Sequence, residues 1–306
     1  MSELDMSVTL SGIKLDNPVI PASGTFGYGH EFAELYDLNI LGSIAFKGTT
    51  REARFGNPTP RIAEIPSGMI NSVGLQNPGI EKVISEELPR LREHFEKPVI
   101  ANISGFEAED FVYCAERLDA VENVGILEIN ISCPNVRSGG VSIGACPSDA
   151  AAVTAAVKKA VKKPVYVKLT PNVTDITEIA KAAVAAGADA LSMINTLTGM
   201  AIDAESQRPL LARVIGGLSG PAVKPVALRC VWETSRAVDV PILGMGGITN
   251  GQDAIEFILA GATAVAVGTS NFMDPASTVK VINGIIDYCE RHGVKDINEL
   301  RGALKC

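Results

Sequence analysis

Short apolar runs alternate with longer amphipathic segments along most of the chain. The runs are rich in β-branched and aliphatic residues, and their apolar positions are continuous, which is typical of strands covered on both faces of a parallel sheet. Four of the eight runs begin at or just after a proline, a residue that commonly bounds strands. The predicted strands are residues 18–23, 42–47, 98–104, 125–132, 164–169, 188–195, 241–247 and 263–269.

Segments with helical patterns lie between these strands, among them residues 80–95, 107–121, 147–161, 173–188 and 249–262. Several end in Gly-Ala, which suits a helix C-cap before the next strand. Eight strand-helix units in about 250 residues predict an α/β fold of the (β/α)8 TIM barrel class, and we expect one domain over residues 1–306. A doubly wound sheet is the weaker alternative, because no Gly-x-Gly-x-x-Gly turn follows the first strand.

Three segments depart from a minimal barrel. Residues 6–16 predict a β-hairpin with a Ser-Gly turn, which we expect to cover the bottom of the barrel. Residues 48–78 and 196–222 are long insertions, rich in Gly and Pro, after the second and sixth strands. Loops of this length are usually functional or disordered, and both follow the carboxyl end of a strand, the face where barrel enzymes keep their sites.

Composition narrows the class of partner. The net charge is −8 and no dense run of Lys or Arg occurs, which argues against nucleic acid or an anionic membrane as the main partner. We expect no secretory signal and no membrane span, since no window reaches about 18 uninterrupted apolar residues. The six cysteines are scattered without a C-x-x-C pair, which predicts reduced thiols in the cytoplasm and no metal or iron–sulfur site in this chain.

Polar residues and glycines stand at the predicted strand ends, and we expect them to converge on one rim of the barrel. The set includes two lysines and no acidic residue. Glycine pairs after strands seven and eight favour a phosphate site, although tight turns alone would also require glycine. The strand-end residues are Ser23, Lys47, Asn102, Asn130, Lys168, Asn195, Gly246 with Gly247, and Gly268 with Thr269.

Three further features could take part in chemistry or ligand binding. Lys168 could pair with a bound anion, form a Schiff base or simply extend to solvent. Cys133 ends the fourth strand beside polar residues and directly before Pro134, although cysteine usually behaves as a small hydrophobe. The segment 68–79, rich in amides and glycines, could wrap a small planar polar ligand or could be ordinary turns.

Six motifs in this chain, in this order, resemble those of the dihydroorotate dehydrogenases of pyrimidine biosynthesis. The resemblance covers essentially the whole chain. Cysteine at 133, where the membrane-bound class has Ser, indicates class 1, and NPTPR with GLQNPG resembles class 1B, the catalytic subunit of the NAD-linked enzyme. The motifs are NSVGLQNPG, EINISCPN, VYVKLTPN, INTLTGMAID, GMGGITNGQDAIEFILAGA and AVGTSNF.

The resemblance implies a barrel that holds FMN and oxidises dihydroorotate to orotate. Cys133 would be the catalytic base that removes the C5 proton, while the C6 hydride passes to the flavin. The flavin would lie among Ser23, Lys47, Gly48, Asn102, Asn130, Lys168, Ile194, Gly220, Gly246, Gly247, Gly268 and Thr269. The substrate would contact Lys47, Asn71, Ser72, Val73, Gly74, Leu75, Asn130, Asn195 and Thr196. Relatives commonly have Ala and Ile at positions 72 and 73, and we expect these small changes to leave the chemistry intact.

Electrons must then leave the reduced flavin, and the chain shows neither a dinucleotide fingerprint nor iron–sulfur spacing. Class 1B implies a partner subunit carrying FAD and a 2Fe-2S cluster, which passes electrons to NAD in a heterotetramer of two catalytic and two electron-transfer subunits. The nearest alternative is a class 1A homodimer that uses fumarate. More remote alternatives are a Schiff-base lyase acting through Lys168 and a non-catalytic flavin-binding barrel.

Overall fold

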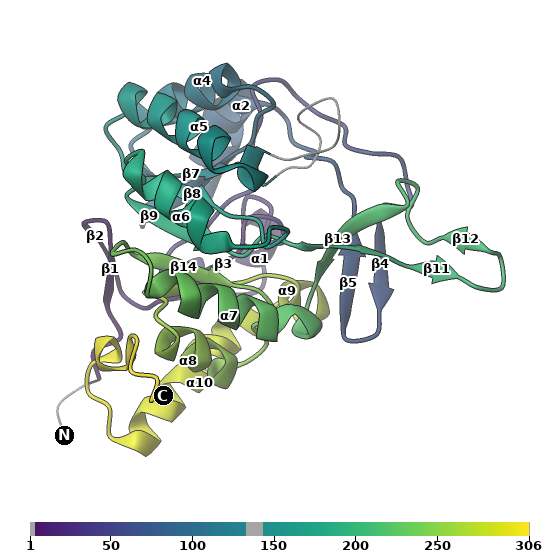
Figure 1. The fold of residues 1–306 in the computed structure, drawn as a ribbon. Helices are drawn as coiled ribbons and strands as arrows, with labels where there is room; N and C mark the ends of the chain where they lie inside the picture. The colour runs from purple at the N-terminus through teal and green to yellow at the C-terminus, as the bar shows by residue number, and fades with distance from the viewer. Residues whose placement is uncertain (1–3, 133–142, 306) are drawn as a thin grey trace.

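A curled sheet of seven parallel strands forms the centre of the protein (Figure 1). The computed structural model describes residues 4–132 and 143–305. Neighbouring strands pair in parallel throughout the sheet. In spatial order the strands are β3 (Val19–Pro21), β15 (Ala264–Val267), β14 (Ile242–Met245), β9 (Ala190–Met193), β8 (Val165–Lys168), β7 (Val124–Asn130) and β6 (Val99–Ile103).

Residues 42–47 lie between the two edge strands, where the sequence predicts an eighth strand. The Ala45 N–H donates to the carbonyl of Pro21 in β3 (3.3 Å), and the Phe46 N–H donates to the carbonyl of Ile100 in β6 (3.1 Å). The Ile100 N–H in turn donates to the Ile44 carbonyl (2.8 Å). The sheet therefore returns on itself, and the predicted TIM barrel architecture is confirmed.

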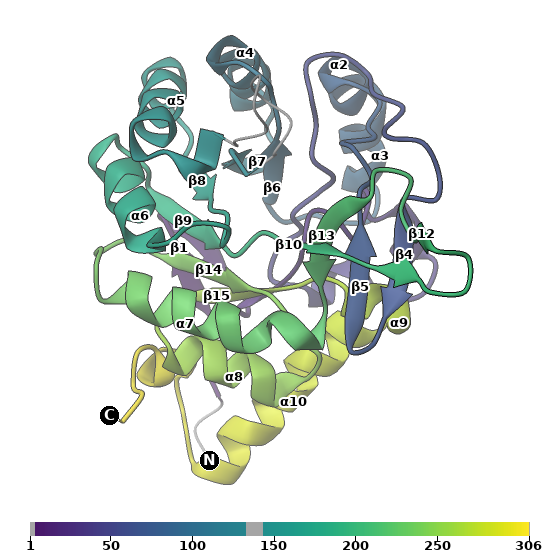
Figure 2. The same cartoon turned by 45° about the vertical axis from the view of Figure 1, so that its right-hand side comes forward.

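Helices follow the strands and surround the sheet (Figure 2). The predicted helix at residues 80–95 consists of α2 (Ile80–Lys82), the π-helical turn η2 (Val83–Glu87) and α3 (Leu88–Arg92). Within the described residues, no helix is long and apolar enough to cross a membrane. The remaining helices are α1 (His30–Ala33), η1 (Leu38–Ile40), α4 (Ala108–Asp119), η3 (Ile143–Ala145), α5 (Pro147–Ala160), α6 (Ile176–Ala185), η4 (Pro221–Val223), α7 (Lys224–Ser235), α8 (Gly251–Leu259), α9 (Ser270–Met273), α10 (Ser277–His292) and η5 (Ile297–Leu300).

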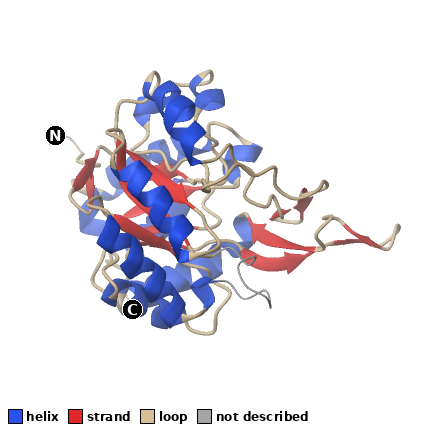
Figure 3. Ribbon diagram, turned by 90° about the horizontal axis from the view of Figure 1, so that it is seen from above, coloured by secondary structure: helices blue, strands red, loops and turns tan. Residues whose placement is uncertain are grey.

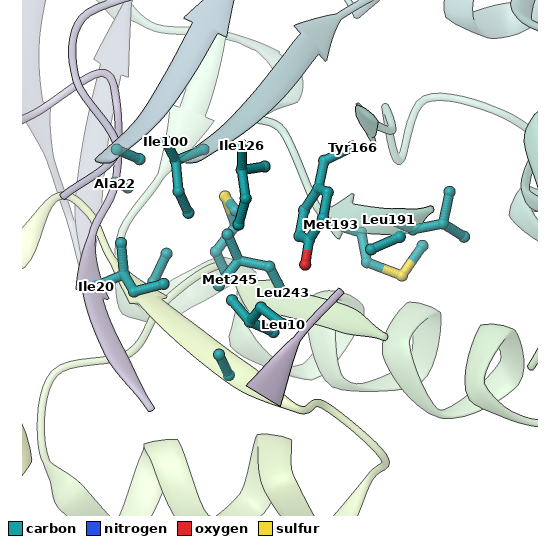
Figure 4. Packing of buried hydrophobic residues seen from close by; sticks show 14 of the residues in the cluster. Leu10, Ile20, Ala22, Ile100, Ile126, Tyr166, Leu191, Met193, Leu243 and Met245 are labelled. Carbon is teal, nitrogen blue, oxygen red and sulfur yellow. The ribbon is translucent and has the colours of Figure 1, made fainter. Parts of the chain in front are cut away.

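The predicted N-terminal hairpin is present and covers the amino end of the barrel. It consists of β1 (Val8–Leu10) and β2 (Ile13–Leu15), paired antiparallel around a turn at Ser11 and Gly12. Ser11 Oγ lies 3.2 Å from both the Tyr166 hydroxyl and the Asp189 carbonyl, close to where β8 and β9 begin. Leu10 and Tyr166 lie among the buried apolar side chains at this end (Figure 4).

The two long insertions pair with each other, which the sequence analysis did not anticipate. Both contribute strands to one antiparallel sheet, in the order β10-β13-β5-β4, beside the barrel (Figure 3). Register partners such as Gly217 with Asn71 and Leu218 with Ile70 join segments far apart in the sequence. The strands are β4 (Ile62–Ile65), β5 (Gly68–Asn71), β10 (Leu197–Met200) and β13 (Ile215–Ser219), with a small hairpin of β11 (Ile202–Asp203) and β12 (Arg208–Pro209).

Helices α8 and α10 cross where two glycines meet, and this contact is directly testable. A Cβ at position 251 would lie 2.5 Å from Gly284 Cα and 2.6 Å from the Ile285 nitrogen, so Gly251→Ala forces backbone apart. We expect it to cost about 1–3 kcal/mol, seen in thermal unfolding followed by circular dichroism. The exposed Asn283→Ala on α10 is the matched control and should not lower the melting temperature. Equal melting temperatures for G251A and wild type would contradict this account of the packing.

Candidate active site

The predicted strand-end residues meet at the carboxyl end of the barrel. Asn130 and Lys168 are register partners at the ends of β7 and β8. Asn195, just past β9, donates from Nδ2 to Asn130 Oδ1 (3.2 Å). Lys168 Nζ donates to Ser23 Oγ across the barrel (3.4 Å). The structure therefore brings together side chains from four separate strand ends, as the sequence predicts.

An acidic residue that the predicted set of strand-end residues does not contain lies in contact with two members of that set. Glu128 of β7 is fully buried, and its Oε1 lies 3.8 Å from Lys168 Nζ. The same oxygen accepts a hydrogen bond from Asn102 Nδ2. Glu128 stands two residues before Asn130, and side chains on a strand alternate between faces. A charged residue at this spacing inside an apolar run was the sequence signal that could have revealed it.

Lys47 is a half-buried cation without a counter-charge in the described part of the chain. No carboxylate ion-pairs with it there, and the other charge acting on it is that of Arg61, which is also positive. Burial, followed by repulsion from Arg61, lowers the pKa of the Lys47 ammonium. A cation in this situation is a good site for an anionic ligand, because the ligand's charge removes the cost of burying the ammonium.

The amide-rich loop after β5 is held by residues that the sequence analysis did not single out. Asn77 donates from Nδ2 to Thr50 Oγ1 (2.7 Å) and to the Leu75 carbonyl (2.8 Å), and its Oδ1 accepts from the Gly79 N–H (2.9 Å). Asn57 donates from Nδ2 to the Ser72 carbonyl (2.9 Å). These bonds fix the loop backbone without using the Ser72 hydroxyl, which is buried and has no partner within the described residues.

Three glycines of the rim are required by the backbone itself. Gly246, Gly247 and Gly220 have φ values of 127°, 80° and 99°, a region that favours glycine. A Cβ at position 247 would also lie 2.9 Å from the Gly220 carbonyl oxygen. Thr269 Oγ1 donates to Ser219 Oγ (2.8 Å), which joins the loop after β15 to the second insertion. These constraints account for the glycines without a ligand, so their role with a phosphate stays a prediction.

The other predicted residues lie at further strand ends and in the two insertions. Asn71 ends β5 and donates from Nδ2 to the Gly217 carbonyl (3.3 Å), and the Thr196 carbonyl accepts from Asn172 Nδ2 (3.0 Å). Ile194 is buried directly after β9. Val73, Gly74 and Leu75 belong to the amide loop, whereas Gly268 follows β15. Cys133, the predicted base, lies outside the described residues.

A polar atom without a hydrogen-bond partner at the rim fits a ligand with several hydrogen-bonding edges. Asn102 Oδ1 is buried and has no partner in the described part of the chain. A Cβ at position 48 would lie 2.7 Å from this oxygen, so the backbone can approach Asn102 this closely only because residue 48 is glycine. Buried polar groups are normally paired, and this unpaired one is suited to a polar ring system.

Replacement of Lys47 by Met should stabilise the ligand-free protein while it removes anion binding. At neutral pH the buried ammonium costs free energy, so K47M should raise the melting temperature, by ~2–4 °C for each kcal/mol regained. In the folded wild-type protein the pKa of Lys47 lies below the usual 10.5. The difference in stability between K47M and wild type should therefore shrink as the pH rises from that lowered pKa toward 10.5. A K47M protein less stable than wild type at pH 7 would contradict this.

Comparisons with known proteins agree with the resemblance in the motifs. The sequence profile of the family described as dihydroorotate dehydrogenase matches residues 5–288. Relatives named dihydroorotate dehydrogenase B (NAD(+)), catalytic subunit, include one from Alkaliphilus metalliredigens, 55% identical over 99% of this chain and 100% of its own length. The same name is carried by relatives from Geotalea daltonii and Bacteroides fragilis. The first is 55% identical over 100% of both chains, and the second is 53% identical over 98% of this chain and 99% of its own length.

The fold has a solved counterpart. The crystal structure of DHODH in complex with ferulenol from Eimeria tenella aligns with a TM-score of 0.81 over 98% of this chain and 88% of that chain. Its sequence identity of 23% supports the shared fold alone. The family profile and the full-length relatives carry the stronger conclusion: the chain belongs to the dihydroorotate dehydrogenase family.

Proposed function

We propose that this chain is the catalytic subunit of an NAD-linked, class 1B dihydroorotate dehydrogenase, which oxidises dihydroorotate to orotate in de novo pyrimidine biosynthesis. The observation that carries the proposal is the full-length similarity to relatives of that name. The rim adds physical support, since it combines cations and amides, which suit an anionic substrate with amide and carbonyl edges.

The family is flavin-dependent, and we propose FMN as the flavin of this chain. The unpaired Asn102 Oδ1 and the paired cation Lys168 fit a polar ring system at the rim. When bound, FMN supplies the acceptor for the substrate hydride. The residues that would hold it are Ser23, Lys47, Gly48, Asn102, Asn130, Lys168, Ile194, Gly220, Gly246, Gly247, Gly268 and Thr269.

Lys47 and the amide loop would bind and orient the substrate. The lowered pKa of Lys47 indicates that a carboxylate beside it would be favourable, because the anion offsets the cost of burial. The Ser72 hydroxyl would find a partner in the substrate. The residues proposed to contact the substrate are Lys47, Asn71, Ser72, Val73, Gly74, Leu75, Asn130, Asn195 and Thr196.

Cys133 would serve as the base that takes the proton from C5 of dihydroorotate. C5 lies next to a carbonyl, so its proton is acidic enough for a positioned thiolate to remove. In the sequence Cys133 follows Asn130 by three residues, so a base there would act on a ligand held by Asn130. Polar surroundings lower the pKa of a thiol from its ordinary ~8.5 and so favour the thiolate.

The names of the relatives include the words catalytic subunit, which supports a second subunit for this chain. We propose that this partner carries FAD and a 2Fe-2S cluster, passes electrons to NAD and assembles with the chain as a heterotetramer in the cytoplasm. A fumarate-linked class 1A homodimer is the alternative within the family. Lys168 Nζ donates to Ser23 Oγ and lies 3.8 Å from the Glu128 carboxylate, and a cation held between these groups favours a binding role over Schiff-base chemistry.

Anaerobic reduction of the flavin-loaded chain tests the proposal. Dihydroorotate should bleach the flavin absorbance, and only NAD together with the electron-transfer subunit should restore it. Reoxidation by fumarate without a partner would move the chain to class 1A. A flavin-loaded protein that dihydroorotate does not bleach would overturn the dehydrogenase assignment.

Replacement of Cys133 by Ala should slow that bleaching by about 10²–10⁴-fold, because a positioned base contributes this much to proton transfer. Flavin binding should be unchanged, which the visible spectrum of the purified variant checks. Cys289→Ala, a change at a buried thiol of α10, is the matched control and should bleach at the wild-type rate. Wild-type bleaching by C133A would show that another group is the base.

A further inference from the structure

Glu128 is a buried carboxylate for which neither the fold nor the proposed chemistry yet accounts. Its side chain is fully buried, and Oε1 takes both the Asn102 Nδ2 hydrogen bond and the contact with Lys168 at 3.8 Å. Its Oε2 has no hydrogen-bond partner within the described residues. Burial of an incompletely paired carboxylate is costly, so an apolar residue would serve the barrel core better.

The position of Glu128 separates the apolar interior from the polar rim. On β7 the same face carries Ile126, then Glu128, then Asn130, since side chains alternate along a strand. Ile126 lies among the apolar side chains of the interior (Figure 4). The carboxylate therefore lies one layer below Asn130 and Lys168, at the register position of Asn102 on the neighbouring strand β6.

The contact with Asn102 decides how that amide is presented. Because Nδ2 donates to Glu128, the amide oxygen Oδ1 is the atom left free, and it is the unpaired oxygen beside Gly48. A carboxylate accepts but cannot donate hydrogen bonds, so it holds the amide in this orientation only. Glu128 thus leaves the Asn102 amide oxygen, a hydrogen-bond acceptor, available to a ligand.

We propose that Glu128 is a positioning residue that places a compensating negative charge behind Lys168, so that the bound flavin faces a paired cation and its reduction potential is kept low. The proposal rests on the proposed function, in which Lys168 lies beside the flavin. A lone cation there would stabilise the anionic reduced ring, whereas a paired one stabilises it less. A low potential suits a flavin whose electrons go on to a nicotinamide acceptor.

Replacement of Glu128 by Gln isolates the charge. Glutamine keeps an oxygen that can accept from Asn102 but removes the negative charge beside Lys168. Sulfite is the probe: its lone pair forms a bond to flavin N5, and the displaced electron pair leaves the ring anionic, so its affinity reports the local field. We expect E128Q to bind sulfite about tenfold or more tightly, equivalent to a rise of ~30 mV or more in the two-electron potential.

The controls separate a local effect from a general one. Glu128→Asp keeps the charge and should have a sulfite affinity closer to wild type than to E128Q. Asp189→Asn makes the same acid-to-amide change in the Lys158 ion pair (2.5 Å), near the start of β9, and should leave sulfite affinity unchanged. If D189N and E128Q bound sulfite equally more tightly than wild type, the effect would come from the net charge of the protein and the proposal would be overturned.

Folding is tested separately, since E128Q leaves Lys168 unpaired. If E128Q does not fold, the sulfite affinity of K168Q is compared with that of the double variant E128Q/K168Q. The double variant lacks both charges of the pair, so neither is left buried alone. The double variant should bind sulfite about tenfold more tightly than K168Q. Equal affinities in that pair, or in wild type and a folded E128Q, would overturn the role of Glu128 while leaving the proposed function intact. A wild-type protein that binds flavin but is not bleached by dihydroorotate would instead overturn the proposed function.

Discussion

Closure of the sheet by residues 42–47 is the constraint on which the site depends. Hydrogen bonds from this segment reach β3 on one side and β6 on the other, and only then do all strand carboxyl ends face one rim. The segment ends at Lys47, so the same bonds that complete the barrel carry this cation into the ring that holds Asn130 and Lys168. Because the strands are parallel, the last residue of every strand lies at the same end of the barrel.

The second organising contact is the pairing of β5 with β13, which joins the two insertions. It places Asn71, the last residue of β5, against the Gly217 carbonyl. The loop that follows is then fixed by Asn57 and Asn77. The rim thus combines a floor made by the barrel strands with a wall supplied by the two insertions.

Much of this arrangement could be predicted from local pattern. Continuous apolar runs located the barrel strands, and the polar residues at or near the ends of these runs identified Asn102, Asn130, Lys168 and Asn195. The pairing of the insertions could not be predicted, because β5 and β13 are short and β13 is glycine-rich, and their partners lie far apart in the sequence. Pairing over such distances is encoded by packing rather than by local periodicity.

Glu128 and Asn77 were missed for different physical reasons. Glu128 lies inside an apolar run and not at a strand end, so the strand-end pattern does not include it. Its role depends on contacts with Asn102 and Lys168 from neighbouring strands. Asn77 supports the loop through bonds to Thr50 and Gly79, and an asparagine beside glycine and proline looks like an ordinary turn residue. In both cases the role follows from contacts that only the folded chain creates.

We propose that one rim holds the flavin on the barrel floor and the substrate under the amide loop. A crystal structure of the chain with FMN and orotate would test this arrangement. We expect the flavin ring against Asn102 and Lys168, with orotate between the ring and residues 71–75 and its carboxylate beside Lys47. Orotate bound away from Lys47 and the amide loop, or flavin bound outside the rim, would contradict it.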